Sequence, residues 1–297
     1  MTITFLGTGA AELNPNPFCH CVHCEEARRL IAAGTYKPRK RTATMLGNQV
    51  MVDFGPDVMA ASMDYSAPMT ELEHIFITHT HEDHLSIPNI GVLTMTKEPL
   101  GRPVNIYLSP QGYKWIFDMI NATSKLYSPV MALSNLQNDG LIKFHSFTPY
   151  ENHKVGDMEV YAVQSNHMSY GAGEYALNYR FTLADGKKIL YVTDSGLYSD
   201  YNLKMLGNSK CDMVIMEGTR GLRETHDESS HLNAELFCRN IKNFIEYGIV
   251  KEDAKVYATH IATSPEFFLH DDTYQKYLNE NCGGVPILAV DGLKVEF

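Results

Sequence analysis

The chain has 297 residues, of which 44% are hydrophobic, and it carries a formal net charge of −10. This composition is typical of a soluble globular protein, and no apolar run approaches the roughly 20 residues of a membrane span. Nucleic-acid binding depends largely on Lys and Arg contacts to phosphate, so the acidic balance weighs against nucleic acid and leaves a small anionic substrate as the expected partner.

The first predicted element is a strand over residues 3–6, which runs into Gly7-Thr8-Gly9. The chain starts on this strand and not on a basic segment followed by a long apolar core, so we expect a cytoplasmic protein. Two glycines this close indicate a tight turn, and no lysine follows them as in a phosphate-binding P-loop.

Three cysteines come next, Cys19, Cys21 and Cys24, in C-x-C-x2-C spacing. Thiolates this close together can hold one tetrahedral zinc ion. In a reducing compartment such a cluster favours metal binding over a disulfide framework. We therefore predict a structural zinc, with a short helix over residues 25–33 closing over it.

The remaining elements alternate between strands and helices. In chain order, we predict a hairpin over 44–54, a helix over 58–65, a strand over 74–77, a helix over 87–96, a strand over 104–108, a helix over 110–123, strands over 144–147 and 158–163, a hairpin over 175–192, a strand over 212–216, an amphipathic helix after 231 and a strand over 255–258. No linker, repeat or charge run divides the chain, so we predict one α/β domain over residues 1–297.

Several predicted strands end at a residue that can bind metal or move a proton: His79, His167, Asp194, Glu217 and His260. A single polar residue at a strand end is ordinary capping. Sites of α/β proteins are commonly built at the carboxyl ends of strands, so five such residues are expected to converge in space.

The densest group of candidate ligands is Thr78-His79-Thr80-His81-Glu82-Asp83-His84. His79 and His81 alternate and could point to one side of the turn, with Asp83 and His84 serving a neighbouring position. Imidazole and carboxylate suit zinc, manganese or iron. Two half-sites on one loop suggest a dinuclear centre, where two cations share and activate a water.

The string H-x-H-x-D-H resembles the signature of the metallo-β-lactamase superfamily of hydrolases. The resemblance implies a four-layer α/β/β/α sandwich that holds two divalent metals, zinc or manganese. It assigns His79, His81 and His167 to the first metal and Asp83, His84 and His260 to the second. Asp194, in Tyr-Val-Thr-Asp-Ser-Gly, is similar to the aspartate that bridges the two metals.

The glycine-rich opening with the cysteine cluster behind it is similar to a narrower branch. That branch includes the cyclic phosphodiesterase of the carbon–phosphorus lyase pathway and the pyrroloquinoline quinone biosynthesis protein B. In the phosphodiesterase, a histidine three residues after the last active-site ligand completes the structural zinc site, and Thr263 stands at that position here. His270, His20, His23 and water remain alternatives for the fourth ligand.

His231 follows Ser229-Ser230 at the start of the amphipathic helix, and these serines are its expected N-caps. The start of a helix favours an anionic ligand nearby. Phosphodiesterases of the superfamily have a histidine here that serves the scissile phosphate or the leaving oxygen, and Glu217 is expected to orient its ring. Asp83, His231 and Glu217 are thus the predicted catalytic residues.

The predicted activity is hydrolysis of a small phosphodiester, a cyclic, sugar or nucleotide phosphate. A lactone or carboxylic ester hydrolase and a non-catalytic protein of cofactor biosynthesis are the alternatives. Transfer-RNA processing would call for a long basic insertion, which we do not find. The sequence leaves open whether the chain forms a homodimer.

Overall fold

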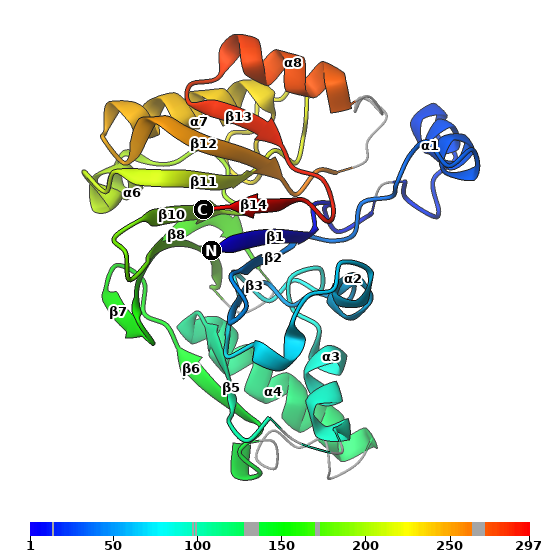
Figure 1. Ribbon diagram of the computed structural model, residues 1–297, viewed down its shortest axis with the longest axis vertical. Helices are drawn as coiled ribbons and strands as arrows, with labels where there is room; N and C mark the ends of the chain where they lie inside the picture. Colours follow the sequence, from blue (N-terminus) through cyan, green and yellow to red (C-terminus); the bar gives the residue numbers. More distant parts are fainter. Residues whose placement is uncertain (14, 97, 99, 128–136, 170–172, 263–270) are drawn as a thin grey trace.

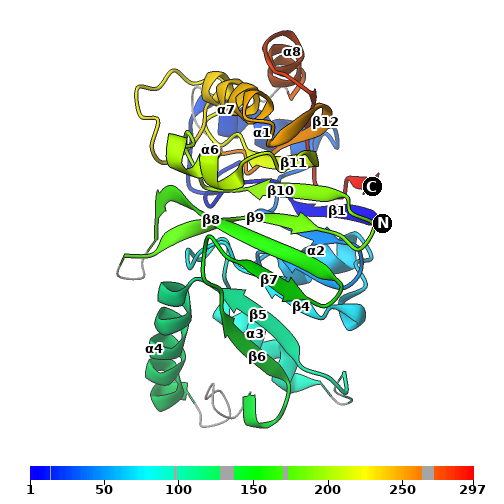
Figure 2. The same ribbon diagram turned by 90° about the vertical axis from the view of Figure 1, so that its left-hand side faces the viewer.

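The computed structural model describes residues 1–13, 15–96, 98, 100–127, 137–169, 173–262 and 271–297. Within these residues the strands form two facing sheets, and helices cover the outer face of each sheet (Figures 1 and 2). The predicted α/β/β/α sandwich is therefore confirmed. No helix in this part of the chain has the length and apolar character that a membrane crossing requires.

The first sheet has the strand order β14-β1-β2-β3-β4-β5-β6. Its strands are β1 (Thr2–Gly7), β2 (Ala43–Leu46), β3 (Val50–Val52), β4 (His74–Phe76), β5 (Val104–Leu108), β6 (Ile142–Ser146) and β14 (Lys294–Glu296). β2 and β3 form the predicted hairpin, and β3 to β6 run parallel. The parallel strands therefore bring their carboxyl ends to one edge of the sandwich.

The second sheet has the strand order β13-β12-β11-β10-β9-β8-β7. Its strands are β7 (Asn152–Val155), β8 (Met158–Met168), β9 (Tyr175–Thr182), β10 (Lys188–Val192), β11 (Cys211–Glu217), β12 (Val250–Thr259) and β13 (Val285–Leu288). β9 and β10 form the second predicted hairpin, and β10 to β13 run parallel. This sheet repeats the half-antiparallel, half-parallel arrangement of the first.

Helices form the two outer layers. α2 (Val58–Asp64), α3 (Ile87–Val92) and α4 (Pro110–Tyr127) cover the first sheet, and α6 (Asp200–Leu206), α7 (Ala234–Glu246) and α8 (Asp271–Asn281) cover the second. Two 3-10 turns, η1 (Met69–Glu71) and η2 (Leu93–Met95), lie beside the first sheet. α1 (Val22–Ala32) projects from the sandwich at one side (Figure 1).

Side chains of each central strand alternate between two apolar cores. On β10, Ile189 and Tyr191 pack between the sheets, whereas Leu190 and Val192 pack under the helices. Strands buried on both faces are nearly continuous apolar runs in the sequence, as β10 is.

Among the predicted boundaries that differ in the structure, two concern candidate ligands. β8 continues to Met168, so His167 lies inside the strand and not beyond it. α1 begins at Val22, so Cys24 belongs to the helix that was expected only to cover the cysteine cluster.

The predicted N-caps of the amphipathic helix are wrong. α7 is capped by Asn233, whose side chain accepts a hydrogen bond from the backbone N–H of Leu236 at 2.9 Å. Asn is as good an N-cap as Ser, and both serine hydroxyls donate to Asp227 instead. His231 therefore lies in the loop before α7 and not in its first turn.

Replacement of Phe76 by Ala tests the core between the sheets. Phe76 is fully buried, and its ring centroid lies 4.6 Å from that of Tyr107 and 5.1 Å from that of Phe181. We expect Phe76→Ala to lower the free energy of unfolding of the metal-free protein by about 3–5 kcal/mol, measured by urea denaturation. Phe18→Ala is the matched control, because Phe18 is 93% exposed and its loss should change stability by less than about 0.5 kcal/mol. Equal effects of the two variants would contradict the described core.

Candidate metal centre

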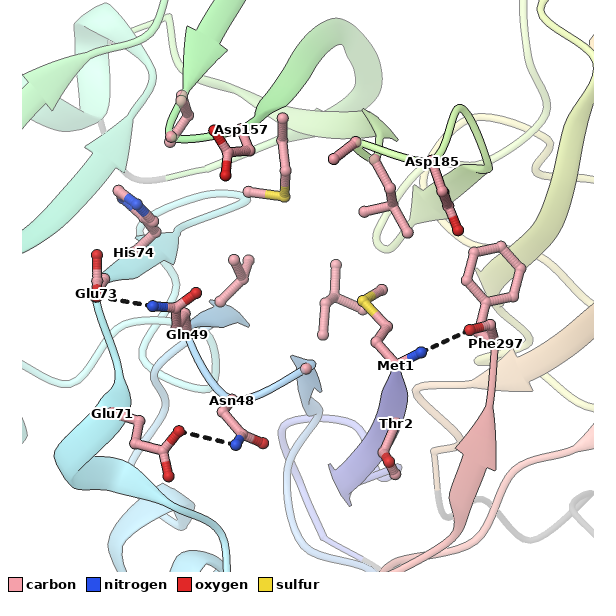
Figure 3. Close-up of a pocket in the computed structure, with 18 residues that line it drawn as sticks. Met1, Thr2, Asn48, Gln49, Glu71, Glu73, His74, Asp157, Asp185 and Phe297 are labelled. Carbon is pink, nitrogen blue, oxygen red and sulfur yellow. Dashed lines mark hydrogen bonds between the residues drawn. The ribbon is translucent and has the colours of Figure 1, made fainter.

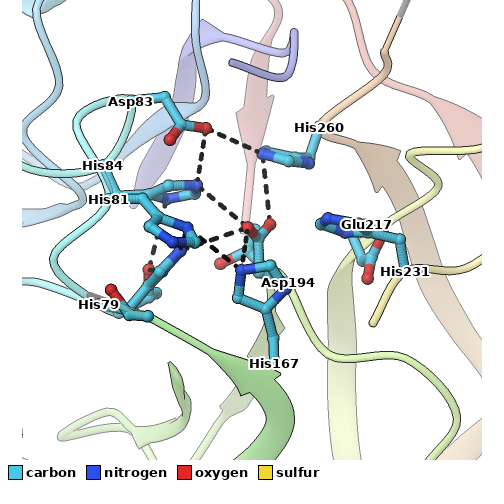
Figure 4. Close-up of polar contacts among 12 residues, drawn as sticks. His79, His81, Asp83, His84, His167, Asp194, Glu217, His231 and His260 are labelled. Carbon is cyan, nitrogen blue, oxygen red and sulfur yellow. Dashed lines mark hydrogen bonds and ion pairs between the residues drawn. The ribbon is translucent and has the colours of Figure 1, made fainter. Parts of the chain in front are cut away.

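The carboxyl ends of β3 and β4 from one sheet and of β10, β11 and β12 from the other meet beside a cavity of about 410 Å³. Ligand-type side chains from both sheets point toward one another there (Figure 4). The convergence expected from the strand ends is therefore seen for His79, His81, Asp83, His84, His167, Asp194, Glu217, His231 and His260.

The first group of ligand atoms comes from His79, His81, His167 and Asp194, and these atoms all lie within 4.8 Å of one another. Nδ1 of His81 is 2.9 Å from Nε2 of His79 and 3.2 Å from Nε2 of His167. Oδ2 of Asp194 lies 3.4 Å from Nε2 of His79. Three imidazole nitrogens and one carboxylate oxygen thus surround a single point.

The second group comes from Asp83, His84 and His260. Oδ2 of Asp83 lies 3.1 Å from Nε2 of His84 and 3.4 Å from Nε2 of His260. Oδ1 of Asp194 is 3.2 Å from Nε2 of His260. Oδ2 of Asp194 also lies 3.5 Å from Nε2 of His84, so Asp194 faces both groups, which is the position that the resemblance assigned to a bridging aspartate.

Backbone strain accompanies this arrangement. Asp53, Asp194 and His260 adopt φ angles of 64°, 51° and 57°, in the left-handed region. A non-glycine residue held in a sparsely populated conformation costs of order 1–3 kcal/mol, so the surrounding packing must impose it. Each of these residues directly follows a strand or lies two residues beyond one, where the chain turns sharply into the site.

Asp53 supports two ligands from the first sheet. Its Oδ2 lies 2.7 Å from Nδ1 of His84. Its Oδ1 accepts hydrogen bonds at 2.9 Å from the backbone N–H and the hydroxyl of Thr78, and that hydroxyl is 3.0 Å from Nδ1 of His79. Partners on Nδ1 leave Nε2 of each imidazole to face the cavity, as metal-binding histidines usually require.

Glu217 has the corresponding place in the second sheet. Its Oε2 accepts a hydrogen bond from the hydroxyl of Thr219, and that hydroxyl lies 2.8 Å from Nδ1 of His260. The same Oε2 is 3.4 Å from Nδ1 of His231. One buried carboxylate from each sheet thus holds two histidines.

The buried charges shift one another's pKa values. Burial alone would raise the pKa of Asp194, but His260 and His84 hold it well below its usual range. Burial opposes the charged form of His84, yet Asp83 and Asp53 raise its pKa well above the usual value. The metal-free site therefore keeps its carboxylates ionised beside imidazoles that compensate their charge.

His231 and Glu217 form a second coupled pair. Burial disfavours the charged form of His231, but the adjacent Glu217 carboxylate raises the pKa of His231 to about 9. The pKa of Glu217 falls to about 2, because His231 outweighs the opposing effect of burial. The ring of His231 also lies beside His167, with centroids 4.8 Å apart.

The residues present fit divalent cations. Nε2 of His84 and Oδ1 of Asp194 are buried, and neither has a hydrogen-bond partner of acceptable geometry among the described residues. Buried polar atoms are rarely left without a partner, and these two point toward the other ligand atoms. Imidazole nitrogen with carboxylate oxygen is a donor set suited to zinc or manganese.

The cysteine cluster lies apart from this centre, in the segment that carries α1. The sulfurs of Cys19, Cys21 and Cys24 lie within 4.8 Å of one another and could hold a metal ion. His20 lies outside the group, and its Nδ1 is 2.7 Å from a carboxylate oxygen of Glu25. Thr263 and His270, which bear on the fourth ligand, fall outside the described residues.

A larger cavity, of about 910 Å³, lies at the amino ends of β3 and β4 (Figure 3). Two pairs of its polar side chains are hydrogen-bonded to each other, Asn48 with Glu71 and Gln49 with Glu73. No group of candidate metal ligands in the described residues lies there. We therefore place the candidate site in the smaller cavity.

Asp53, Thr78 and Thr219 support the site although the sequence did not single them out. Asp53 directly follows β3, so the strand-end rule that selected the other residues applies to it as well. Thr78 and Thr219 carried no such signal, because a hydroxyl becomes informative only when its neighbours in space are known.

Comparison with known proteins agrees with this geometry. The family model described as "Beta-lactamase superfamily domain" matches residues 48–261. No curated protein matches the chain.

Solved structures similar to the chain include a diphosphatase from the PhnP family (19% identity, TM-score 0.69, covering 100% of this chain and 96% of that one). YhfI from Bacillus subtilis, a metallo-β-lactamase fold protein, is also similar (16%, 0.66, 99% of each chain). So is Zn(2+)-bound PqqB from Methylobacterium extorquens (15%, 0.68, 100% of each chain). At these identities the likeness shows the fold, and the resemblance drawn from the sequence is confirmed.

Addition and removal of Mn²⁺ test whether the two ligand groups bind cations. We use Mn²⁺ because thiolates of the cysteine cluster prefer softer ions. After treatment with a chelator, Mn²⁺ at about 100 times its Kd should raise the free energy of unfolding by about 2.7 kcal/mol, with a matching rise in Tm. Asp194→Ala should remove most of this response, since Asp194 faces both groups. If neither Mn²⁺ nor Zn²⁺ raised the Tm of the unsubstituted protein, that result would argue against a metal centre.

Proposed function

The chain belongs to the β-lactamase superfamily, and from that premise we propose that it is a metal-dependent hydrolase with two divalent cations, whose substrate is a small phosphodiester. The pair of His231 and Glu217 beside the two ligand groups carries this proposal. It adds a proton donor to residues that could bind metal, which a purely structural metal site would not need.

The first cation would be held by His79, His81 and His167, the second by Asp83, His84 and His260, with Asp194 between them. Cations bound there, zinc or manganese, would supply positive charge and lower the pKa of a shared water toward neutrality. The protein's part is to fix the imidazole orientations through Asp53 and Glu217, as described above.

His231 is placed to protonate the leaving oxygen. It lines the cavity, and Nδ1 faces Glu217 at 3.4 Å, which leaves Nε2 as the nitrogen available to the substrate. Glu217 is held in turn by backbone N–H groups of Ser195 at 2.9 Å and Leu232 at 3.2 Å. General acid catalysis requires this kind of fixed geometry before a suitable pKa.

Arginines in the cavity wall favour an anionic substrate. Arg220 and Arg223 line the cavity, and guanidinium groups suit phosphate oxygens. Arg220 also forms an ion pair with Asp227 at 2.6 Å and a hydrogen bond to Ser230 at 2.9 Å. These contacts hold the loop that carries His231.

A direct assay compares the substrate classes. The Mn²⁺-loaded protein should hydrolyse bis(4-nitrophenyl) phosphate faster than a simple lactone. Preferential lactone cleavage would support the carboxylic ester alternative instead. Bound metal with no turnover of either substrate would favour a non-catalytic role in cofactor biosynthesis.

His231→Ala tests the proton donor. We expect kcat for the phosphodiester to fall by roughly 100-fold or more, with a smaller change in KM, because general acid catalysis typically contributes that factor. His226→Ala is the matched control, since His226 is an exposed histidine in the same loop. A kcat that is the same in both variants would remove His231 from the mechanism.

A further inference from the structure

The buried carboxylate of Glu174 is hydrogen-bonded to the loop over residues 78–84, which we call the histidine loop. Glu174 is 1% exposed and directly precedes β9. Its Oε2 accepts hydrogen bonds from the backbone N–H of Thr80, at 3.3 Å, and from the Thr80 hydroxyl. Its Oε1 accepts a hydrogen bond at 2.9 Å from the hydroxyl of Ser109. The carboxylate therefore joins two segments that are distant in the sequence.

The first of these contacts lies between two candidate ligands. Thr80 separates His79 from His81 and is fully buried. Its hydroxyl is directed to Glu174, whereas nitrogens of the flanking imidazoles lie 2.9 Å apart in the site. The orientation of Thr80 therefore limits the directions in which both imidazoles can point.

β8, the strand that carries His167, also contacts Thr80 and Glu174 through Ser169. The hydroxyl of Ser169, two residues after His167, lies 3.0 Å from the hydroxyl of Thr80. The backbone N–H of Ser169 donates to the backbone oxygen of Glu174 at 3.0 Å. The three histidines of the first ligand group are thus connected through Thr80, Ser169 and Glu174.

The second contact anchors the carboxylate at the start of α4. The Ser109 hydroxyl accepts a hydrogen bond at 2.8 Å from the backbone N–H of Gly112, as an N-cap does. The positive end of an 18-residue helix stabilises a carboxylate at this position. A Cβ atom at Gly112 would lie 2.5 Å from Oε1 of Glu174, so the first helical turn and the carboxylate are in direct contact.

We propose that Glu174 is a positioning residue for the first metal. It fixes the backbone and side chain of Thr80 against α4, so that His79 and His81 already converge with His167 before a cation binds. Ordering a flexible loop on binding reduces affinity, and a preorganised site avoids that cost. This inference rests on the proposed function, because it takes the first ligand group to be a cation site.

Three substitutions separate the two contacts of Glu174. Glu174→Met keeps the length of the side chain and removes both acceptors. Glu174→Gln can keep an oxygen toward Thr80 and donate its amide N–H to Ser109. Ser109→Ala removes the contact to α4 and leaves that to Thr80, so it loosens the anchor without removing the acceptor of Thr80.

The experiment measures Mn²⁺ binding to the full chain. Free Mn²⁺ is quantified by its electron paramagnetic resonance signal. The unsubstituted protein should bind two equivalents. In Glu174→Met we expect one of the two to bind about tenfold more weakly, as when groups supporting metal ligands are removed. Glu174→Gln should restore most of that affinity. Ser109→Ala should weaken the same equivalent by less than Glu174→Met does, because Thr80 keeps its acceptor.

Unchanged Mn²⁺ affinity in folded Glu174→Met would overturn the proposal, as would an equal loss in Ser109→Ala. Should Glu174→Met fail to fold, Thr80→Val is the second variant, because it removes the hydroxyl that contacts Glu174 and Ser169 and should weaken one equivalent in the same direction. An unsubstituted protein that binds neither Mn²⁺ nor Zn²⁺ at the two ligand groups would overturn the proposed function itself, which is a different result from a variant that binds normally.

Discussion

Two buried carboxylates, Asp53 after β3 and Glu217 at the end of β11, hold the candidate centre together. Asp53 contacts His84 directly and His79 through Thr78, and Glu217 contacts His231 directly and His260 through Thr219. The two halves of the sandwich thus support the site in the same way. Because each carboxylate occupies one nitrogen of an imidazole, the other nitrogen is directed to the cavity.

This arrangement stores unfavourable free energy that bound cations would offset. Left-handed backbone at Asp194 and His260 is costly, and polar atoms of His84 and Asp194 are buried without hydrogen-bond partners among the described residues. Such a cluster persists only where the fold around it is rigid. The cores on both faces of β10 and its neighbours provide that rigidity, since they are packed between the sheets and under the helices.

The histidine loop is also held by Glu174, which is not one of the candidate ligands. Glu174 connects the loop to α4, which otherwise only covers the first sheet. His231 differs from the ligands, because it sits in a loop braced by the ion pair of Arg220 and Asp227. A rigid group of candidate ligands beside the separately held His231 agrees with the proposed hydrolase.

The α/β alternation, the ligand-rich loop and the residues at the strand ends could be predicted from the sequence, because apolar periodicity and short-range spacing are local properties. It did not identify β7, β13 or β14, which are short strands at or beside the sheet edges with mixed polar faces. It also misplaced the cap of α7, since Ser229, Ser230 and Asn233 are all good caps and only the position of Asp227 decides among them. The supporting roles of Asp53, Thr219 and Glu174 are visible in the folded chain alone, because they depend on hydrogen bonds to residues that are 31, 41 and 94 positions away.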